Sequence, residues 1–564
     1  MLFTGTFLVT MEIIEYSCDP LVDGEYPMPI EPDAPPPSML PQPCQLVIFG
    51  APGDLSWRKL LPAVYNLNVD GVLPSHFAAV GFGLPAEGDV KGDPDEWMRN
   101  RARDGISRFS RQDLDEGHWA DFARSLFFVP GSFNDASAYA RLKARLDAVD
   151  AQFGIPASRI YYLAVPPGLV DMCVSRLKDA GMVNDPGEQT AFTRVIVEKP
   201  IGRDLDSARE VIATVSKAFA ENQTYRIDHY LGKETVQNLL VLRFANSIFE
   251  PLWNGKYIDH VQITVAEEEG LAQYDPDTGE MLATRAGYFE GLGALRDMVQ
   301  NHMLQVLCIV AMEPPWSLAP DVVRDAKVGV LNCLRHMTPQ DVEKNVVRGQ
   351  YIEGDVNGKR VPGYRKEVRD AFAMMKKPLP PSSVNSTTET FIALKMFIDN
   401  WRWAGVPFYL RTGKRLPKRS TEVAIQFKDV PHILFNDHPE VPLEPTVLSL
   451  RVQPEEGLSM RIASKLPGPK VRIYPVKMEF NYASSFGGKT PEAYERLLLD
   501  VMAGDATLFM RRDAVESAWR FVMPILEHWE ANRARDIPEY QCGSWGPIEA
   551  DRIIEPDGRQ WRRL

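Results

Sequence analysis

The densest group of chemically active side chains lies near the middle of the chain, in Arg226-Ile-Asp-His-Tyr-Leu-Gly-Lys-Glu234. His229, Tyr230 and Lys233 can donate hydrogen bonds, and a phosphate dianion is bound by several donors that converge on it. The mixture therefore predicts a phosphate-binding site. A polar loop that leads into a helix has a similar composition and is the structural alternative.

A second polar group, Arg296-Asp-Met-Val-Gln-Asn-His302, precedes an apolar stretch over residues 303–311. An imidazole with a carboxylate holding its other ring nitrogen can accept a proton near neutral pH. His302 is therefore a candidate general base, whereas a structural histidine at the head of an apolar helix is the alternative. The histidines outside these two groups, among them His76, His118, His432 and His528, have no comparable setting, and we interpret them as structural.

A glycine turn, Gly50-Ala-Pro-Gly53-Asp-Leu55, directly follows an apolar run over residues 46–49. Between a strand and a helix, such glycines let backbone N–H groups approach a pyrophosphate at the helix N-terminus. Because Gly-x-x-Gly is shorter than the full dinucleotide fingerprint, an ordinary turn with Asp54 as the helix N-cap is the alternative. Lys59 and Arg58 follow one turn later, within reach of a 2′-phosphate.

Three further charged segments are candidates for the same site. Glu198-Lys-Pro-Ile-Gly202 closes a predicted strand, so that Lys199 would project between cofactor and substrate, and the bond to Pro200 is a candidate cis peptide. The basic run over residues 411–419 either contributes to the anion site or is a solvated loop. Residues 267–269 are three glutamates without a histidine or aspartate at ligand spacing, so we predict no metal site there.

The secondary-structure elements that must position these residues follow two different patterns along the chain. Apolar strand-like runs alternate with helical stretches up to about residue 225, which predicts a Rossmann-type, doubly wound α/β domain with a parallel sheet over residues 44–226. Over residues 227–564, strand-like segments often follow one another without a helix between them. This order favours an α+β domain with a large, mainly antiparallel sheet. Residues 234–244, 293–311 and 492–503 are its predicted helices.

Composition and net charge exclude several classes of function and partner. The chain has 564 residues, of which 45% are hydrophobic and 25% charged, as is typical of a soluble globular protein. A net charge of −13 argues against nucleic acid and anionic membrane as partners. Seven acidic residues and nine prolines lie within residues 1–43, which we expect to form a mobile extension or an arm that lies on the surface. Six scattered cysteines and the absence of a long apolar run predict a cytoplasmic protein.

Taken together, these motifs closely resemble the glucose-6-phosphate dehydrogenase family. The matching segments occur in family order and span residues 46 to about 530. They are Gly50-Ala-Pro-Gly-Asp-Leu55, Glu198-Lys-Pro-Ile-Gly202, Arg226-Ile-Asp-His-Tyr-Leu-Gly-Lys-Glu234, Gly287-Tyr-Phe through His302, Arg411-Thr-Gly-Lys414, and Pro491-Glu-Ala-Tyr-Glu-Arg-Leu-Leu-Leu-Asp500.

The resemblance implies oxidation of D-glucose 6-phosphate at C1 to 6-phospho-D-glucono-1,5-lactone, with hydride transfer to NADP and His302 as general base, oriented by Asp228. It implies a homodimer or homotetramer. The implied substrate-binding residues are Lys199, His229, Tyr230, Lys233, Glu267, Asp297, Lys414 and Arg419. The expected cofactor-binding residues are Gly50, Ala51, Pro52, Gly53, Asp54, Leu55, Lys59, Tyr162 and Lys199.

The chain departs from the family pattern at two cofactor positions. Pro52 stands where members often have Ser or Thr, and Leu84 stands where NADP users have an arginine. NADP is therefore the expectation from the family, with NAD or dual use as the alternative. Two rival functions are an NAD-linked dehydrogenase of another sugar phosphate and a non-catalytic sensor on the same fold. The presence of both His302 and Asp228 argues against the sensor.

Overall fold

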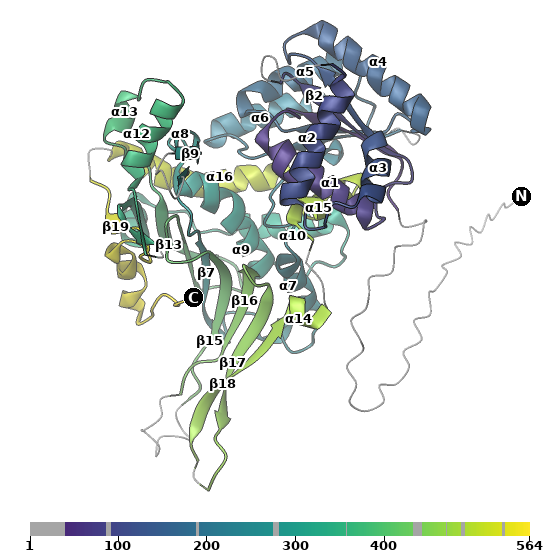
Figure 1. The fold of residues 1–564 in the computed structure, drawn as a ribbon. Coiled ribbons are helices and arrows are strands. Elements are labelled where there is room, and N and C mark those ends of the chain that lie inside the picture. The colour runs from purple at the N-terminus through teal and green to yellow at the C-terminus, as the bar shows by residue number, and fades with distance from the viewer. Residues whose placement is uncertain are drawn as a thin grey trace, which may run out of the picture.

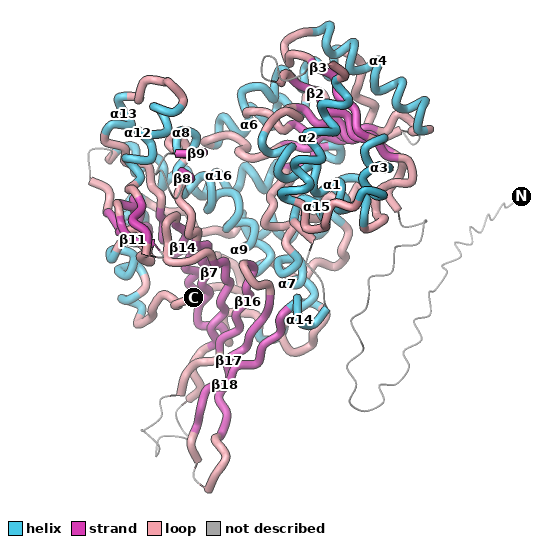
Figure 2. The backbone as a smooth tube through the Cα atoms, in the orientation of Figure 1, coloured by secondary structure: helices cyan, strands magenta, loops and turns pink. Residues whose placement is uncertain are grey.

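The computed structural model describes residues 40–85, 92–187, 191–274, 281–356, 358–431, 443–469, 471–486, 491–532 and 536–564. Most of the predicted N-terminal extension, residues 1–39, lies outside the described residues. Two sheets, each with its own helices, account for most of the described chain (Figures 1 and 2).

The first sheet has six parallel strands in the order β3-β2-β1-β4-β5-β6. Its strands are short and almost wholly buried because helices cover both faces, as the apolar runs predicted. The strand order reverses between β1 and β4, which is where open α/β sheets bind ligands. The strands are β1 (Cys44–Phe49), β2 (Phe77–Gly83), β3 (Leu126–Pro130), β4 (Arg159–Leu163), β5 (Thr193–Val197) and β6 (Thr224–Arg226).

The second sheet has nine strands in the order β18-β17-β16-β15-β7-β14-β13-β10-β19. Most neighbours are antiparallel, as predicted, but β7 pairs with β14 and β10 with β19 in parallel. The strands are β7 (Ile258–Ala266), β10 (Val346–Ile352), β13 (Phe391–Phe397), β14 (Pro407–Gly413), β15 (Ser420–Phe427), β16 (Val447–Gln453), β17 (Gly457–Lys465), β18 (Ile473–Asn481) and β19 (Glu539–Gln541). Two small hairpins pair β8 (Ala272–Tyr274) with β9 (Met281–Thr284), and β11 (Gly354–Val356) with β12 (Lys359–Val361).

The helices of the first part are α1 (Leu61–Val69), α2 (Pro94–Phe109), α3 (Glu116–Arg124), α4 (Ala136–Phe153), α5 (Val170–Asp179) and α6 (Leu205–Ser216). Those of the second part are α7 (Glu234–Phe244), α8 (Ala286–Phe289), α9 (Leu304–Ala311), α10 (Pro320–Asn332), α11 (Pro339–Asn345), α12 (Tyr364–Met374), α13 (Pro381–Val384), α14 (Tyr482–Phe486), α15 (Ala493–Ala503) and α16 (Arg512–Ala531). Among the described residues, no helix is both long and apolar enough to cross a bilayer.

One late helix packs back onto the first part of the chain. α15 lies against α1, although more than 400 residues separate them in the sequence (Figure 1). The Glu495 carboxylate is buried there and accepts hydrogen bonds from Asn66 Nδ2 at 2.8 Å and from Arg111 Nε at 2.8 Å. A helix from the last third of the chain therefore completes the packing of the first domain.

Candidate active site

His302 and Asp228 form a buried hydrogen-bonded pair. Nδ1 of His302 lies 2.5 Å from Oδ1 of Asp228, and both side chains are at most 1% exposed. Burial alone would raise the pKa of Asp228, but the charge and hydrogen bond of His302 lower it to about 2. An ionised Asp228 accepts the Nδ1 proton, so Nε2 of His302 retains the lone pair with which a base accepts a proton.

An unusual helix positions His302. The predicted helix over residues 293–311 is present, but its first part is a π-helix, η6 (Leu295–Met303), which continues into α9. Short π-helical segments inside α-helices are frequently found at functional sites. Glu389 anchors the start of η6, because its buried carboxylate accepts a hydrogen bond from Leu295 N at 3.0 Å. Gly293, at φ +73°, leaves room for that carboxylate, which a Cβ would approach to 2.2 Å.

Lys199 connects the histidine to a second carboxylate. The residue follows β5, and the Lys199-Pro200 bond is cis, as the sequence suggested. Its Nζ lies 2.8 Å from Nε2 of His302 and donates a hydrogen bond to Oδ1 of Asp297 at 3.1 Å. Burial would raise the pKa of Asp297, but the charges of Lys199 and Lys414 hold it well below its ordinary value. His302 Nε2 therefore faces a cation that is held by an anion.

The rings of His229 and Tyr230 pack against His302, each with its centroid 4.5 Å from that of His302. Burial, together with the nearby charges of His302 and Lys199, lowers the pKa of His229 well below its ordinary value. His229 is therefore neutral at physiological pH and can donate one ring N–H. The short turn after β6 brings these residues together, since Tyr230 N donates to Oδ1 of Asp228 at 2.9 Å.

Lys233 and Arg419 share one neutral acceptor. Both donate to Oε1 of Gln453, Lys233 from 3.5 Å and Arg419 from 3.1 Å. Burial lowers the pKa of Lys233, although Glu456 opposes this effect. Sequence reasoning missed Gln453, because a lone glutamine at the end of an apolar strand gives no chemical signal.

Strand register explains how Glu267 and Lys414 meet. Each lies one residue beyond the end of a strand, β7 and β14 respectively, and these strands are parallel neighbours that pair Ala266 with Gly413. Their carboxyl ends therefore reach the same edge of the sheet, where Lys414 Nζ forms an ion pair with Glu267. Burial would lower the pKa of Lys414, but Glu267 and Asp297 raise it. β15 pairs Ser420 with Ala266, so Arg419 reaches the same edge.

The glycine turn fits a dinucleotide. It follows β1 at the point where the strand order reverses, and it leads into the π-helical turn η2 (Ser56–Leu60) and α1. Gly50 has φ +84°, and a Cβ there would lie 2.3 Å from the carbonyl oxygen of Ala164. Only glycine therefore gives the backbone this close approach. Ala51 is buried, and Pro52 and Leu55 complete the turn around Gly53.

The charged residues next to the turn are already paired. Asp54 forms an ion pair of 2.8 Å with Nε of Arg58, and no side chain caps η2. Lys59 Nζ lies 2.8 Å from Oε2 of Glu492, just before α15. Leu84 is 62% exposed at the end of β2. Sequence reasoning missed Arg101 of α2, whose guanidinium donates to the carbonyl oxygen of Pro52 at 2.5 Å.

Glu198 links two tyrosines beneath the site. Its partly buried carboxylate accepts hydrogen bonds from the hydroxyl of Tyr162 at 2.5 Å and from that of Tyr494 at 3.2 Å. Burial raises the pKa of Glu198, although these hydrogen bonds oppose the effect. Tyr162 itself is fully buried. Tyr494 comes from α15, so its part in the site was not evident from the sequence.

Asp228, His229 and His302 each present one possible metal-ligand atom, and these atoms lie within 4.8 Å of one another. In this arrangement, however, Oδ1 of Asp228 and Nδ1 of His302 are bonded to each other. Binding an ion through those two atoms would require breaking that hydrogen bond. We therefore interpret the group as a base and its carboxylate partner.

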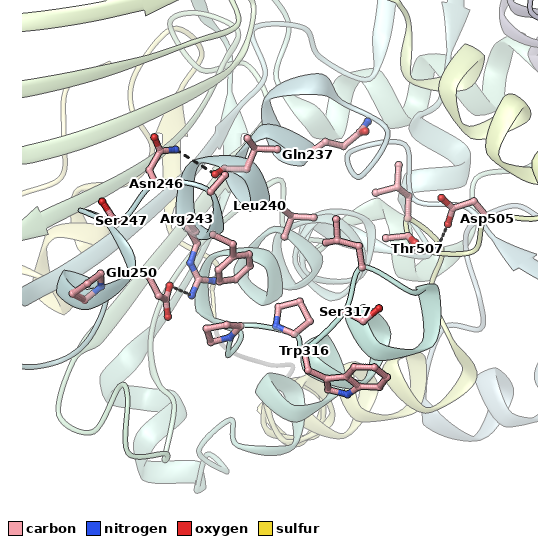
Figure 3. Close-up of a pocket in the computed structure, with 18 of the residues that line it drawn as sticks. Gln237, Leu240, Arg243, Asn246, Ser247, Glu250, Trp316, Ser317, Asp505 and Thr507 are labelled. Carbon is pink, nitrogen blue, oxygen red and sulfur yellow. Dashed lines mark hydrogen bonds and ion pairs between the residues drawn. The ribbon is translucent and has the colours of Figure 1, made fainter. Parts of the chain in front are cut away.

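A separate pocket of about 1180 Å³ opens beside α7 (Figure 3). Its lining is largely apolar and includes Leu240, Trp316 and Leu318, with Arg243 held by Glu250 at one side. None of the site residues predicted from the sequence lines it. The pocket is therefore distinct from the charged site.

Comparisons with known proteins agree over nearly the whole chain. The family model for the NAD binding domain of glucose-6-phosphate dehydrogenase matches residues 47–238, and that for the C-terminal domain matches residues 240–562. A glucose-6-phosphate 1-dehydrogenase of Chlamydia pneumoniae is 42% identical over 525 residues, which cover 93% of this chain and 96% of the relative. One of Aggregatibacter actinomycetemcomitans is 44% identical, with 92% and 97% covered.

Solved structures give the same result. A glucose-6-phosphate dehydrogenase in complex with its substrate glucose-6-phosphate superposes with a TM-score of 0.79 at 30% identity, covering 93% of this chain and 99% of the other. A glucose-6-phosphate 1-dehydrogenase from Mycobacterium avium gives 0.71 at 32% identity, covering 92% and 99%. With its motifs, both sheets and both family models in agreement, the chain belongs to the glucose-6-phosphate dehydrogenase family.

Proposed function

We propose that this oxidoreductase converts D-glucose 6-phosphate to 6-phospho-D-glucono-1,5-lactone, the first step of the oxidative pentose phosphate pathway, with NADP as acceptor. The observation that carries the proposal is the buried His302–Asp228 pair, whose Nε2 lies 2.8 Å from Nζ of Lys199. A base beside a cluster of cations suits an anionic substrate that must lose a hydroxyl proton.

His302 is the general base in this proposal. Asp228 holds the Nδ1 proton and stabilises the imidazolium that forms when Nε2 takes the proton from the C1 hydroxyl. Lys199 occupies Nε2 at 2.8 Å in this structure, and Asp297 offers it an alternative partner. We infer that Lys199 turns toward Asp297 when substrate binds, which frees Nε2 for the hydroxyl.

The phosphate lies between Lys233 and Arg419 in this proposal, with His229 and Tyr230 as further donors. Gln453 holds the two cations near each other without neutralising them. The sugar hydroxyls lie toward Glu267, Asp297 and Lys414. The charges of these three residues are balanced when Lys199, which pairs with Asp297, is included. These roles orient C1 toward His302.

The cofactor lies on the turn over residues 50–55, where the close approach at Gly50 suits a pyrophosphate. Ala51, Pro52, Gly53, Asp54 and Leu55 complete the backbone of this cradle, Lys59 lies beside it, and Tyr162 and Lys199 lie toward the substrate. When bound, a nicotinamide cofactor supplies the acceptor for the hydride that leaves C1. Lys59 would have to leave Glu492 to reach a 2′-phosphate.

The test is a steady-state assay of glucose 6-phosphate oxidation with NADP and NAD in parallel, repeated with galactose and glucosamine 6-phosphates. We expect the highest kcat/KM with glucose 6-phosphate and NADP. A higher value with NAD would favour the NAD-linked or dual-cofactor alternative, and a higher value with another sugar would overturn the substrate assignment.

Several predictions from the sequence stay predictions. They are the division of the chain into residues 1–43, 44–226 and 227–564, the cytoplasmic location, a homodimer or homotetramer, and the lack of a metal, nucleic-acid or membrane partner. The two family models meet near residue 239, whereas the predicted division lies between residues 226 and 227.

A further inference from the structure

Glu367 is a fully buried carboxylate on α12 that the proposed mechanism does not use. Its Oε1 accepts a hydrogen bond from Nη2 of Arg415 at 2.8 Å. Its Oε2 accepts from the hydroxyl of Tyr351 at 2.6 Å and from the backbone N–H groups of Leu271 and Ala272 at 3.0 and 3.1 Å. All of these partners are donors, so removing the carboxylate would leave several buried polar groups unpaired.

The partners of Glu367 belong to the two loops that carry proposed sugar-binding residues. The loop after β7 begins with Glu267, and the loop after β14 begins with Lys414. Glu367 contacts the first loop through the N–H groups at its end, and the second through Arg415, which directly follows Lys414. The loops also contact each other, since Leu416 N donates to the carbonyl oxygen of Glu267 at 3.0 Å. One buried carboxylate therefore joins the two loops whose first residues form an ion pair.

The backbone of Arg415 depends on such contacts. Its φ is +54°, in the left-handed region that favours glycine, and a residue with a side chain stays there only where its surroundings hold it. Gly543 N donates to its carbonyl oxygen at 2.7 Å. A Cβ at Gly270 would lie 2.3 Å from Nε of Arg415, so this glycine leaves the space through which the guanidinium reaches Glu367.

The helix that carries Glu367 also borders Lys414 through α8, against which α12 packs (Figure 1). Nζ of Lys414 lies 5.2 Å from the ring centroid of Phe289 on α8. Tyr364 of α12 packs its ring against Phe289, with the centroids 6.3 Å apart, and its hydroxyl donates to Glu290. α12 thus supports both the backbone next to Lys414 and the ring beside its ammonium group.

We propose that Glu367 is a positioning residue for sugar recognition, which holds the Glu267–Lys414 ion pair where it meets the hydroxyls of the substrate. The inference rests on the proposed roles of Glu267 and Lys414 in binding those hydroxyls. Glu367 itself touches no substrate, because it is fully buried and both of its oxygens are occupied. Polar groups select a hydroxyl only when they are held in fixed positions, and small displacements are costly.

The phosphate end has supports of its own. Arg419 lies in the same loop as Lys414, but it donates to Gln453 at 3.1 Å, and the next residue, Ser420, pairs with Ala266 in the sheet. Loosening the contact between Glu367 and Arg415 should therefore affect the sugar end more than the phosphate end.

The experiment is Glu367→Gln. An amide of the same shape cannot pair with donors through its own NH₂ group, so the variant loses part of the contact to the two loops. We expect the KM for glucose 6-phosphate to rise by about tenfold, with kcat within a few-fold of the wild-type value. The inhibition constant of inorganic phosphate, which binds at the phosphate end alone, should change by less than about twofold.

A glutamate that only stabilises the fold would give a different result. It would lower kcat through the fraction of active enzyme and leave the KM unchanged, and that outcome would overturn the inference. An equal rise in the KM and in the inhibition constant of phosphate would also overturn it, because the disturbance would then not be confined to the sugar end.

Gly270→Ala tests the same contact if Glu367→Gln does not fold, because the added Cβ displaces the Arg415 guanidinium while Glu367 stays. We expect the same rise in KM. The matched control is Glu250→Gln in η5 (Glu250–Leu252), which removes a carboxylate that pairs with Arg243 at 3.1 Å away from the proposed site residues. Its KM for glucose 6-phosphate should equal that of the wild-type enzyme.

Lys414→Met separates this inference from the proposed function. An unchanged KM in that variant would contradict the sugar-binding role of Lys414 itself. A raised KM there, with an unchanged KM in Glu367→Gln, would refute only the role of Glu367. In the double variant, Glu367→Gln should add at most about twofold to the KM of Lys414→Met, because residues that act through one another are not additive. A full tenfold addition would mean that Glu367 does not act through Lys414.

Discussion

The positively charged side chains at the two ends of the candidate active site have different kinds of partner. At the proposed proton-transfer end (His302, Asp228, Lys199, Asp297), Lys199 contacts a carboxylate, and the neighbouring Lys414 forms an ion pair with Glu267. At the proposed phosphate end (Lys233, Arg419, Gln453), both cations contact the oxygen of a neutral amide. One end is organised as ion pairs, whereas the cations of the other form no ion pair among the described residues, although the charge of Glu456 acts on Lys233.

The difference matches the two tasks. A proton that moves from a substrate hydroxyl to an imidazole stays within the site and leaves its net charge unchanged, so paired ions suit the proton-transfer end. A phosphate dianion brings two negative charges, so unneutralised cations suit the phosphate end. Gln453 orients those cations because an amide oxygen accepts hydrogen bonds without carrying a full charge.

The largest expected effect comes from His302→Asn. Without an imidazole at this position, kcat for glucose 6-phosphate oxidation should fall by about 10²- to 10⁴-fold, because general-base assistance is lost. The KM for glucose 6-phosphate should change little, since the phosphate end is intact. Steady-state kinetics measure both values.

His260→Asn is the matched control for that variant. His260 is also buried and its Nδ1 lies 2.7 Å from a carboxylate oxygen of Asp259, but it belongs to β7 away from the proposed site residues. We expect its kcat to stay close to that of the wild-type enzyme. An equal loss in both variants would mean that His302 acts on folding rather than on chemistry.

Lys233→Ala should give the next largest effect, and this effect should be on KM rather than on kcat. Losing one charged donor to the phosphate should raise the KM for glucose 6-phosphate by about 10- to 100-fold. The kcat at saturating substrate should remain within a few-fold of the wild-type value. Lys143→Ala, on the exposed face of α4, is the control for removing a lysine elsewhere. An unchanged KM would contradict the phosphate role.

Gln453→Glu sharpens the comparison by making the phosphate end resemble the other. A carboxylate there would form ion pairs with Lys233 and Arg419, so we expect the KM for glucose 6-phosphate to rise by roughly tenfold. Gln453→Met removes the amide without adding charge and should have a smaller effect. If the two variants raise KM equally, charge neutralisation is not the reason that an amide occupies this position.

Most of the architecture could be predicted from the sequence. The alternating runs predicted the parallel sheet because both of its faces are covered by helices, which makes its strands continuously apolar. The parallel pairing of β7 with β14 could not be predicted, because strand order in a mixed sheet depends on contacts between distant segments. The π-helical form of η6 was equally hidden, since its residues fit an ordinary amphipathic helix.

The site residues also divide into those that could be predicted from the sequence and those that could not. Asp228 and His302 were paired in advance through the family resemblance, and their side chains lie 2.5 Å apart in the structure. Sequence reasoning did not find Gln453, Glu389 and Tyr494, because each is a single residue in an apolar or helical segment. Their importance depends on which distant charge or backbone group they meet, and that depends on the fold.

The packing of α15 against α1 limits how the enzyme can be divided. The dinucleotide-binding half looks like an exchangeable module, yet Asn66 and Arg111 of that half complete their hydrogen bonds on Glu495, and Lys59 on Glu492. If residues 47–238 were replaced by those of a relative, α15 of this chain would therefore pack against side chains that differ from its own partners. Chimeras of this family should exchange residues 47–238 together with α15, because the first half of the structure is built from two segments that are separated in the sequence.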